Sequence, residues 1–177
     1  MYAPTQKFVK LKHNHYLCRM KTFAEFIDNA KTNLCAEYTE KLNKAGSKKS
    51  LIDIALDANG MPWVCEAVAK GKLSSDTIAE DFKPFLNGRY IRAAGGYSSA
   101  LYCKRNDGIE VVTTCALIVD CKGVIRVDRP IAELFLSNSD VAIISNKGSK
   151  VNVYLYNSSV VNNEFIVVRE SKRYGTI

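Results

Sequence analysis

Residues 115–161 read CALIVDCKGVIRVDRPIAELFLSNSDVAIISNKGSKVNVYLYNSSVV, and this stretch determines the fold. Polar and apolar residues alternate in short runs, which is typical of half-buried strands. Turn-forming residues separate the runs, so the apolar positions also keep a longer interval. These positions are Leu117, Ile125, Leu134, Ile143 and Val153, spaced 8, 9, 9 and 10 residues apart.

Two architectures produce such an interval. A β-solenoid stacks coils of about 18–20 residues, each of which contributes two or three short strands. A β-sandwich instead joins short strands by hairpins about every 8–12 residues. The pattern small-Ser-x-Val recurs at 138–141, 148–151 and 157–160, and this repeat favours a short solenoid, with the sandwich as the alternative.

Helical periodicity precedes the β-rich stretch, and it ends at Asn87-Gly88. Residues 93–99 then predict a flexible connection, and Asn106-Asp107-Gly108 between two strand-like runs predicts a hairpin. The predicted class is α+β, in three parts: an extended basic arm (1–21), a helical module (22–87) and an all-β half (88–177). The predicted helix starts are Thr22 with Glu25 as a capping box, Ser50 with Asp53, Pro62 in a first turn, and Ser75 or Asp76 as a cap.

Composition and charge narrow the function. With 47% hydrophobic and 24% charged residues, the 177-residue chain is neither disordered nor of low complexity. No apolar run reaches the roughly 18 residues of a membrane span, and we expect neither membrane insertion nor a signal peptide. The net charge of +7 is uneven, because residues 1–21 hold five basic side chains and no acidic one.

Catalytic and metal motifs are missing from the sequence. The six cysteines form no C-x-x-C pair and are interpreted as free thiols. His13 and His15 are the only histidines, and a solvent-facing strand explains them better than a metal site does. Gly95-Gly96 belongs to no phosphate-binding motif. The sequence therefore predicts no enzyme, no cofactor, no metal and no catalytic residue.

Two segments are candidates for binding. A short solenoid exposes edge strands, which self-association would cover, and we expect the β half to form a homo-oligomer. The alternating arm segment Lys7-Phe8-Val9-Lys10-Leu11-Lys12 predicts strand addition to a neighbouring subunit. The candidate oligomer-interface residues are Val141, Ile143, Val151, Val153 and Leu155.

Four runs of the chain resemble small proteins encoded by tailed phages and prophages of gut Bacteroidetes, the crAss-like phages among them. The resemblance covers about residues 33–161. It implies a virion-associated part, such as a head fibre or a capsid-decorating protein, made in the host cytoplasm and often trimeric. Its N-terminal segment would anchor it to the capsid or to another virion protein. The runs are LCAEYTEKLNKAGSKKSLIDIALDANGMPWVCEAVAKG, FKPFLNGRYI, YSSALYCKRNDGIEVVTTCALIVDC and SNSDVAIISNKGSKVNVYLYNSSVV.

Other functions compete with this interpretation. A nucleic-acid-binding module would use the basic arm and the lysines of the first predicted helix, and its binding would weaken strongly with salt. A polysaccharide-acting enzyme on the solenoid is the third hypothesis. In the virion-protein interpretation, exposed turns would suit weak glycan contacts on a host surface through Asn138, Tyr154, Tyr156 and Asn157. The helix lysines are Lys41, Lys44, Lys48 and Lys49.

Overall fold

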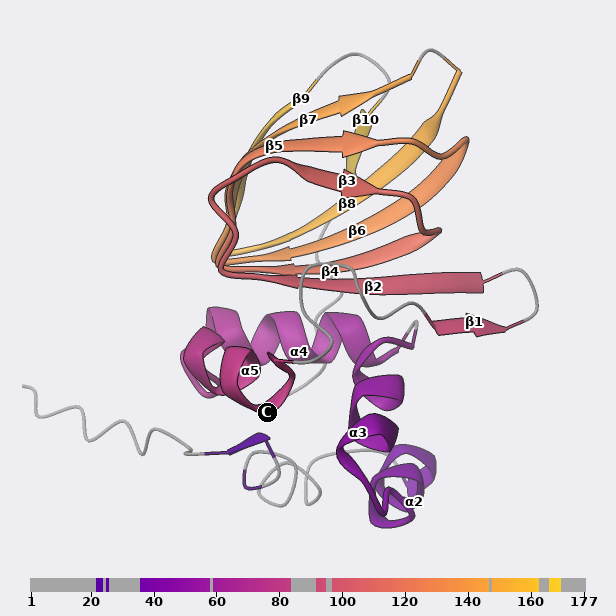
Figure 1. The fold of residues 1–177 in the computed structure, drawn as a ribbon, viewed down its shortest axis with the longest axis vertical. Coiled ribbons are helices and arrows are strands. Elements are labelled where there is room, and N and C mark those ends of the chain that lie inside the picture. The colour runs from indigo at the N-terminus through magenta and orange to yellow at the C-terminus, as the bar shows by residue number, and fades with distance from the viewer. Residues whose placement is uncertain are drawn as a thin grey trace, which may run out of the picture.

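The protein combines a helical layer with a two-sheet β-solenoid (Figure 1). The structure, a computed structural model, describes residues 22–23, 25, 36–57, 59–83, 92–94, 97–146, 148–162 and 166–169. The helices of this part are α2 (Ala36–Asn43), α3 (Lys48–Ala55), α4 (Gly60–Ala69) and α5 (Ser75–Asp81).

The strands form two sheets. The six-stranded sheet has the order β1 (Arg92–Ala94), β2 (Tyr97–Cys103), β4 (Cys115–Val119), β6 (Ile131–Ser137), β8 (Lys150–Tyr156) and β10 (Ile166–Arg169). The four-stranded sheet has the order β3 (Ile109–Val111), β5 (Lys122–Val127), β7 (Asp140–Ser145) and β9 (Ser159–Asn162).

From β2 onward, consecutive strands alternate between the two sheets, so the chain winds as a solenoid with two strands in each coil. Every strand pair between coils is parallel, whereas β1 pairs with β2 antiparallel. Ser99 pairs with Cys115, Cys115 with Glu133, and Ile131 with Lys150, in steps of 16, 18 and 19 residues. The predicted short solenoid is confirmed, and the sandwich alternative is excluded because its hairpins would be antiparallel.

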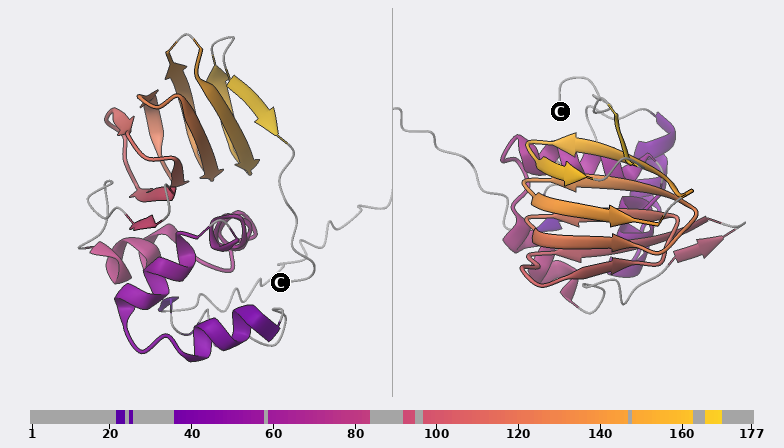
Figure 2. Two further views of the ribbon diagram at one scale, coloured as in Figure 1. Left: turned by 90° about the vertical axis from the view of Figure 1, so that its right-hand side faces the viewer. Right: turned by 90° about the horizontal axis from the view of Figure 1, so that it is seen from above.

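The space between the two sheets is the first of two cores. It is filled by one side chain in every two along each strand, among them Ile118, Ile125, Leu134 and Ile143, each at most 2% exposed. The second core lies on the opposite face of the six-stranded sheet, where the helices pack (Figures 1 and 2). Strands of this sheet are therefore buried on both faces, which explains the unbroken apolar run of β4.

Helix α4 lies at the centre of the second core. Nine of its ten residues are buried, and the helix contacts β4, β6 and β8. The Ser137 hydroxyl donates a hydrogen bond to the Cys65 carbonyl at 2.8 Å, and the Tyr97 hydroxyl donates to the Leu56 carbonyl at 3.3 Å. The helices and the six-stranded sheet thus share one hydrophobic core.

A ladder of hydrogen bonds joins the turns that lead from the six-stranded to the four-stranded sheet. The Cys121 amide donates to Ser139 Oγ at 3.1 Å, and the Ser139 amide donates to Ser158 Oγ at 3.0 Å. Both serine hydroxyls donate in turn to the carbonyl two residues earlier, of Ser137 and Tyr156, at 3.0 Å. Each coil therefore satisfies a polar group of the coil before it, which fixes the register of the stack.

The residue just before each rung has a left-handed backbone. A positive φ of 48–54° recurs at the same place in four successive coils, and asparagine tolerates this region better than most residues. In two of these coils the Asn157 side-chain amide donates to Asn138 Oδ1 at 2.7 Å. The four residues are Lys104, Asp120, Asn138 and Asn157.

The predicted hairpin at Asn106-Asp107-Gly108 is wrong. β2 and β3, on either side of it, belong to different sheets and pair with β4 and β5. The segment is the arc of a coil, because each of the two strands pairs in parallel with a strand of the next coil. Residues 93–99 are also more than a connection, since β1 ends and β2 begins within them.

Helix starts differ from the predicted ones by a few residues. The capping box is confirmed, with the Glu25 amide donating to Thr22 Oγ1 at 3.0 Å. α3, however, is capped by Ser47, whose hydroxyl accepts from the Ser50 amide at 3.2 Å. α5 is capped by Ser74 in place of Ser75 or Asp76. Serine clusters offer several equivalent caps, and packing of the helix selects one.

The ladder predicts a stability effect at Ser139, which is 2% exposed. We expect Ser139→Ala to lower the free energy of unfolding by about 1–3 kcal/mol, because the buried Cys121 amide loses its acceptor. Urea denaturation measures the change. The control is Ser149→Ala in a turn on the other side of the coil, expected to change stability by less than about 0.5 kcal/mol. Equal effects of the two substitutions would contradict a role of the ladder in stability.

Candidate functional site

The six residues predicted to anchor the chain lie outside the described residues, as do His13 and His15. Those anchoring residues are Lys7, Phe8, Val9, Lys10, Leu11 and Lys12.

The candidate oligomer-interface residues belong to the solenoid interior. Val141, Ile143, Val151 and Val153 are 4%, 2%, 0% and 0% exposed, and Leu155 packs partly buried against the same core. They hold the two sheets of one chain together, which accounts for their burial without a second chain. Strand alternation in the sequence separates two faces but does not tell which face points inward.

The residues predicted for glycan contacts are not brought together. Asn138 and Asn157 line a shallow depression of about 490 Å³ at the turns that lead from the six-stranded to the four-stranded sheet. Its other lining residues are Ser139, Asp140, Ser158 and Ser159. Tyr154 instead stacks on Phe135 beneath the helical layer, with ring centroids 4.7 Å apart, and Tyr156 is 5% exposed. The depression therefore offers amides and hydroxyls without an aromatic platform.

Three of the four lysines of the predicted basic cluster form ion pairs, and the side chain of Lys48 lies outside what the structure describes. Lys41 pairs with Glu37 at 2.9 Å, Lys44 with Glu40 at 2.5 Å and Lys49 with Asp53 at 3.3 Å, each one helical turn apart. These pairs neutralise the basic cluster that the sequence places at the end of the first predicted helix. The basic arm is then the stronger part of the nucleic-acid hypothesis.

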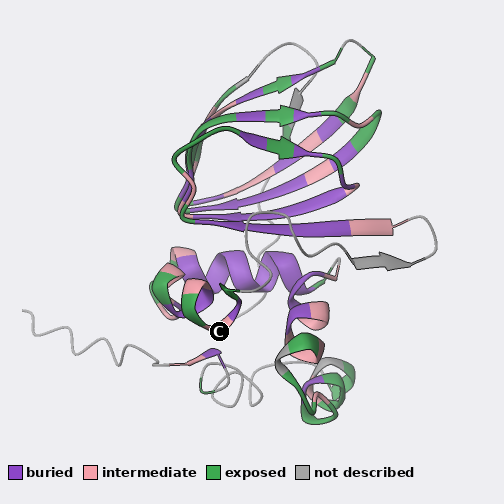
Figure 3. Cartoon of the chain, viewed as in Figure 1, coloured by how far each residue is buried: buried purple, intermediate pink, exposed green. Residues whose placement is uncertain are grey.

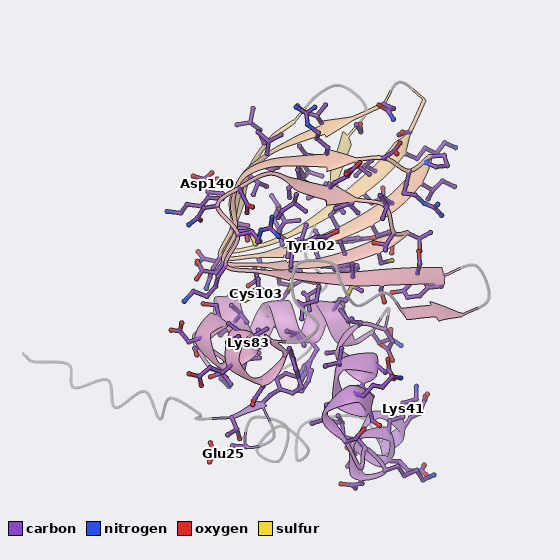
Figure 4. All side chains as sticks on the ribbon, in the orientation of Figure 1. Glu25, Lys41, Lys83, Tyr102, Cys103 and Asp140 are labelled. Atoms are coloured by element: carbon purple, nitrogen blue, oxygen red, sulfur yellow. The ribbon has the colours of Figure 1, made fainter. Side chains whose placement is uncertain are left out.

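The four cysteines in the described residues are buried thiols. Burial raises the pKa of Cys103 to about 12 and the pKa of Cys115 and Cys121 to about 11, and it raises that of Cys65 well above its usual value. Figure 4 shows Cys103 on the strand that faces the helices. Thiols kept protonated at neutral pH are poor nucleophiles and poor metal ligands.

Sequence reasoning missed the outer face of the four-stranded sheet. Buried and exposed residues alternate along β5 and β7 (Figure 3), and several exposed positions are aliphatic. Val124, Ile144 and Val161 are 37%, 43% and 73% exposed, and Val124, Ala142 and Val161 are cross-strand partners in one row. The signal lay in β-branched residues at positions where alternation predicts polar ones.

Charged residues flank this aliphatic row. Lys122 and Asp140 are Cα partners at the start of β5 and β7, and Glu110 and Arg126 are Cα partners on the other side. The face thus carries both signs of charge around an apolar centre, and Figure 4 shows Asp140 at the turn end of the solenoid.

Other site types find no support in the part of the chain that the structure describes. No group of three or more His, Cys, Asp or Glu side chains there is arranged to hold a metal ion. No described helix has the length and apolarity to cross a membrane.

Comparison with protein-family models, with curated proteins and with solved structures finds no match to the chain.

Burial of the thiols predicts slow chemical labelling. In a Cys18→Ser, Cys35→Ser background, we expect the native protein at pH 8 to react with a thiol reagent at least about 100-fold more slowly than the urea-unfolded protein. The reason is that a thiol with a pKa near 11 is almost fully protonated at pH 8. The rate should rise as the pH approaches 11. Native labelling at the unfolded rate would contradict the buried positions.

Proposed function

We propose that the chain is a structural, non-enzymatic protein of a phage particle, a head fibre or capsid-decorating protein that binds the shell through its N-terminal arm. The observation that carries the proposal is that polar side chains of the solenoid form hydrogen bonds to other parts of the same chain. Ser139 and Ser158 join coils to one another, and Ser137 joins a coil to α4. The polar groups thus build a stiff body, which a fibre or decoration protein needs.

The arm supplies the attachment. Its five basic side chains with no acidic one suit an acidic capsid surface, where complementary charge speeds encounter and fixes orientation. The alternation in Lys7–Lys12 suits addition of a strand to a sheet of the shell protein. In the described residues Lys41 and Lys44 form ion pairs, whereas residues 1–21 hold no acidic residue that could pair with their five basic side chains within the arm.

The resemblance to head fibres also implies a homo-oligomer, with a trimer as the usual order. In such an assembly the β half projects from the particle or forms the contacts between subunits. The helical layer follows the arm and precedes the β half along the chain. The protein would be made in the host cytoplasm and reside in the virion.

Binding of nucleic acid by the arm is the alternative, and the charge of residues 1–21 is the observation that favours it. The two functions differ in their response to salt. An arm that binds phosphates loses affinity steeply as the salt concentration rises, whereas strand addition to a shell protein retains its backbone hydrogen bonds.

Deletion of residues 1–21 tests the attachment. We expect the truncated protein to keep its circular dichroism spectrum and solution mass but to be lost from purified particles of the phage that encodes it. Quantitative mass spectrometry of the particles measures the incorporation.

A charge variant sharpens the same test. Replacing Lys7, Lys10 and Lys12 with Glu should reduce incorporation by at least about tenfold, by repulsion from an acidic shell. The matched control is the same change at Lys41, Lys44 and Lys49, whose expected effect is small. Normal incorporation of the deletion protein would refute the attachment. Loss of nucleic-acid binding in the arm variant, with normal incorporation, would favour the alternative.

A further inference from the structure

The outer face of the four-stranded sheet exposes several aliphatic side chains to solvent. Helices pack on the outer face of the six-stranded sheet, whereas the four-stranded sheet presents Val124, Ile144 and Val161 to water. Grouped exposed aliphatic side chains mark interaction surfaces more often than scattered ones do. What distinguishes this face is its pattern of charge.

We propose that this face pairs with the same face of a second copy about a two-fold axis, and that Lys122 and Asp140 form reciprocal ion pairs across the interface. The proposal does not depend on a role in a virion, and it assigns a dimer in place of the trimer that the resemblance implies.

The strand register supplies the argument. A two-fold axis parallel to the strands and midway between β5 and β7 reverses the order of the strands but keeps their direction. It places β5 of one copy over β7 of the other. Two residues that are Cα partners on β5 and β7 of one chain then face each other across the interface. Lys122 and Asp140 are such partners, so Lys122 of one copy faces Asp140 of the other.

The remaining partners on these two strands are compatible with this arrangement. Val124 faces Ala142 of the second copy, and the aliphatic stem of Arg126 faces Ile144. Sheets that pack face to face lie about 10 Å apart, a distance that lysine and aspartate side chains span together. Because a two-fold axis relates the two copies, every complementary pair occurs twice in the interface.

The other in-plane orientation is unfavourable. An axis perpendicular to the strands reverses their direction and brings Lys122 over Arg126 of the second copy when the Val124 row is central. Like charges would then meet at both ends of the interface. Among described residues, neither Lys122 nor Arg126 forms an ion pair within the chain that would neutralise it.

Mixing of two charge variants tests the proposal without relying on stability. Alone, Lys122→Glu places a second carboxylate against Asp140 in both contacts, and Asp140→Lys places two lysines against each other in both contacts. We expect each variant to be monomeric, with a Kd for self-association at least about tenfold weaker than that of the wild-type dimer. In an equimolar mixture, one contact of a mixed pair joins the two substituted side chains, which carry opposite charges, and the other contact keeps the native Lys122–Asp140 pair. We therefore expect the mixture to form a heterodimer.

Sedimentation equilibrium gives the masses, and an affinity tag on one variant identifies the heterodimer by co-purification. The control is Lys150→Glu, the same charge change at the start of β8 in the other sheet, which should leave the wild-type dimer intact. Val161→Asp is an independent variant that should also weaken the dimer at least about tenfold, by charging the aliphatic row.

Three results would overturn the proposal: a monomeric wild-type chain, a trimeric one, or a mixture that stays monomeric while both variants are folded. Rescue by mixing cannot arise from a repaired contact within one chain, because each chain keeps its own substitution. Since the experiment needs no particles, its failure leaves the proposed arm attachment untouched, and loss of the attachment leaves the dimer untouched.

Discussion

The rest of the structure depends on the hydrogen-bonded ladder at the turn between the two sheets. A parallel stack of short strands could slip by two residues and keep its apolar residues inside, because side chains alternate with a period of two. A ladder rung does not tolerate such a slip, since the Cys121 amide reaches its acceptor only when Ser139 lies directly above it. Polar atoms therefore set the register, and apolar atoms supply most of the stability.

The register then decides what the two faces of each sheet can do. With the coils aligned, one side chain in every two fills the space between the sheets and the others form rows on the outside. On the six-stranded sheet these rows include Leu117 and Phe135, which lie in one hydrophobic core with helix α4. On the four-stranded sheet no described helix covers the rows, and Val161 stays in solvent. Described helices thus pack on the outer face of the six-stranded sheet and not on that of the four-stranded sheet.

The sequence predicted the architecture better than its details, for identifiable reasons. The interval from Leu117 to Val153 reports the length of a half-coil, so the solenoid was predictable. The same interval does not report direction, and Leu117 faces the helices while Ile125 and Val153 face the interior. The repeat small-Ser-x-Val mixed the turns at Ser139 and Ser158 with a turn of the opposite side at Ser149, although only the first two form ladder rungs.

The candidate site was less predictable because it depends on the partner of each strand. The hairpin signal at Asn106-Asp107-Gly108 is local, and a parallel partner one coil away outweighs it. The oligomer-interface candidates in β7 and β8 are apolar positions, and the apolar positions of these strands line the interior of the solenoid. In such a fold, an assembly surface is expected at positions where an aliphatic side chain points outward from a strand. Val124 and Ile144 meet that condition, and they do so next to a lysine and an aspartate placed in register. Opposite charges in register on adjacent strands form a surface that is complementary to a second copy of itself. The coil stacking that fixes the fold of one chain therefore also places complementary charges on the outer face of its four-stranded sheet.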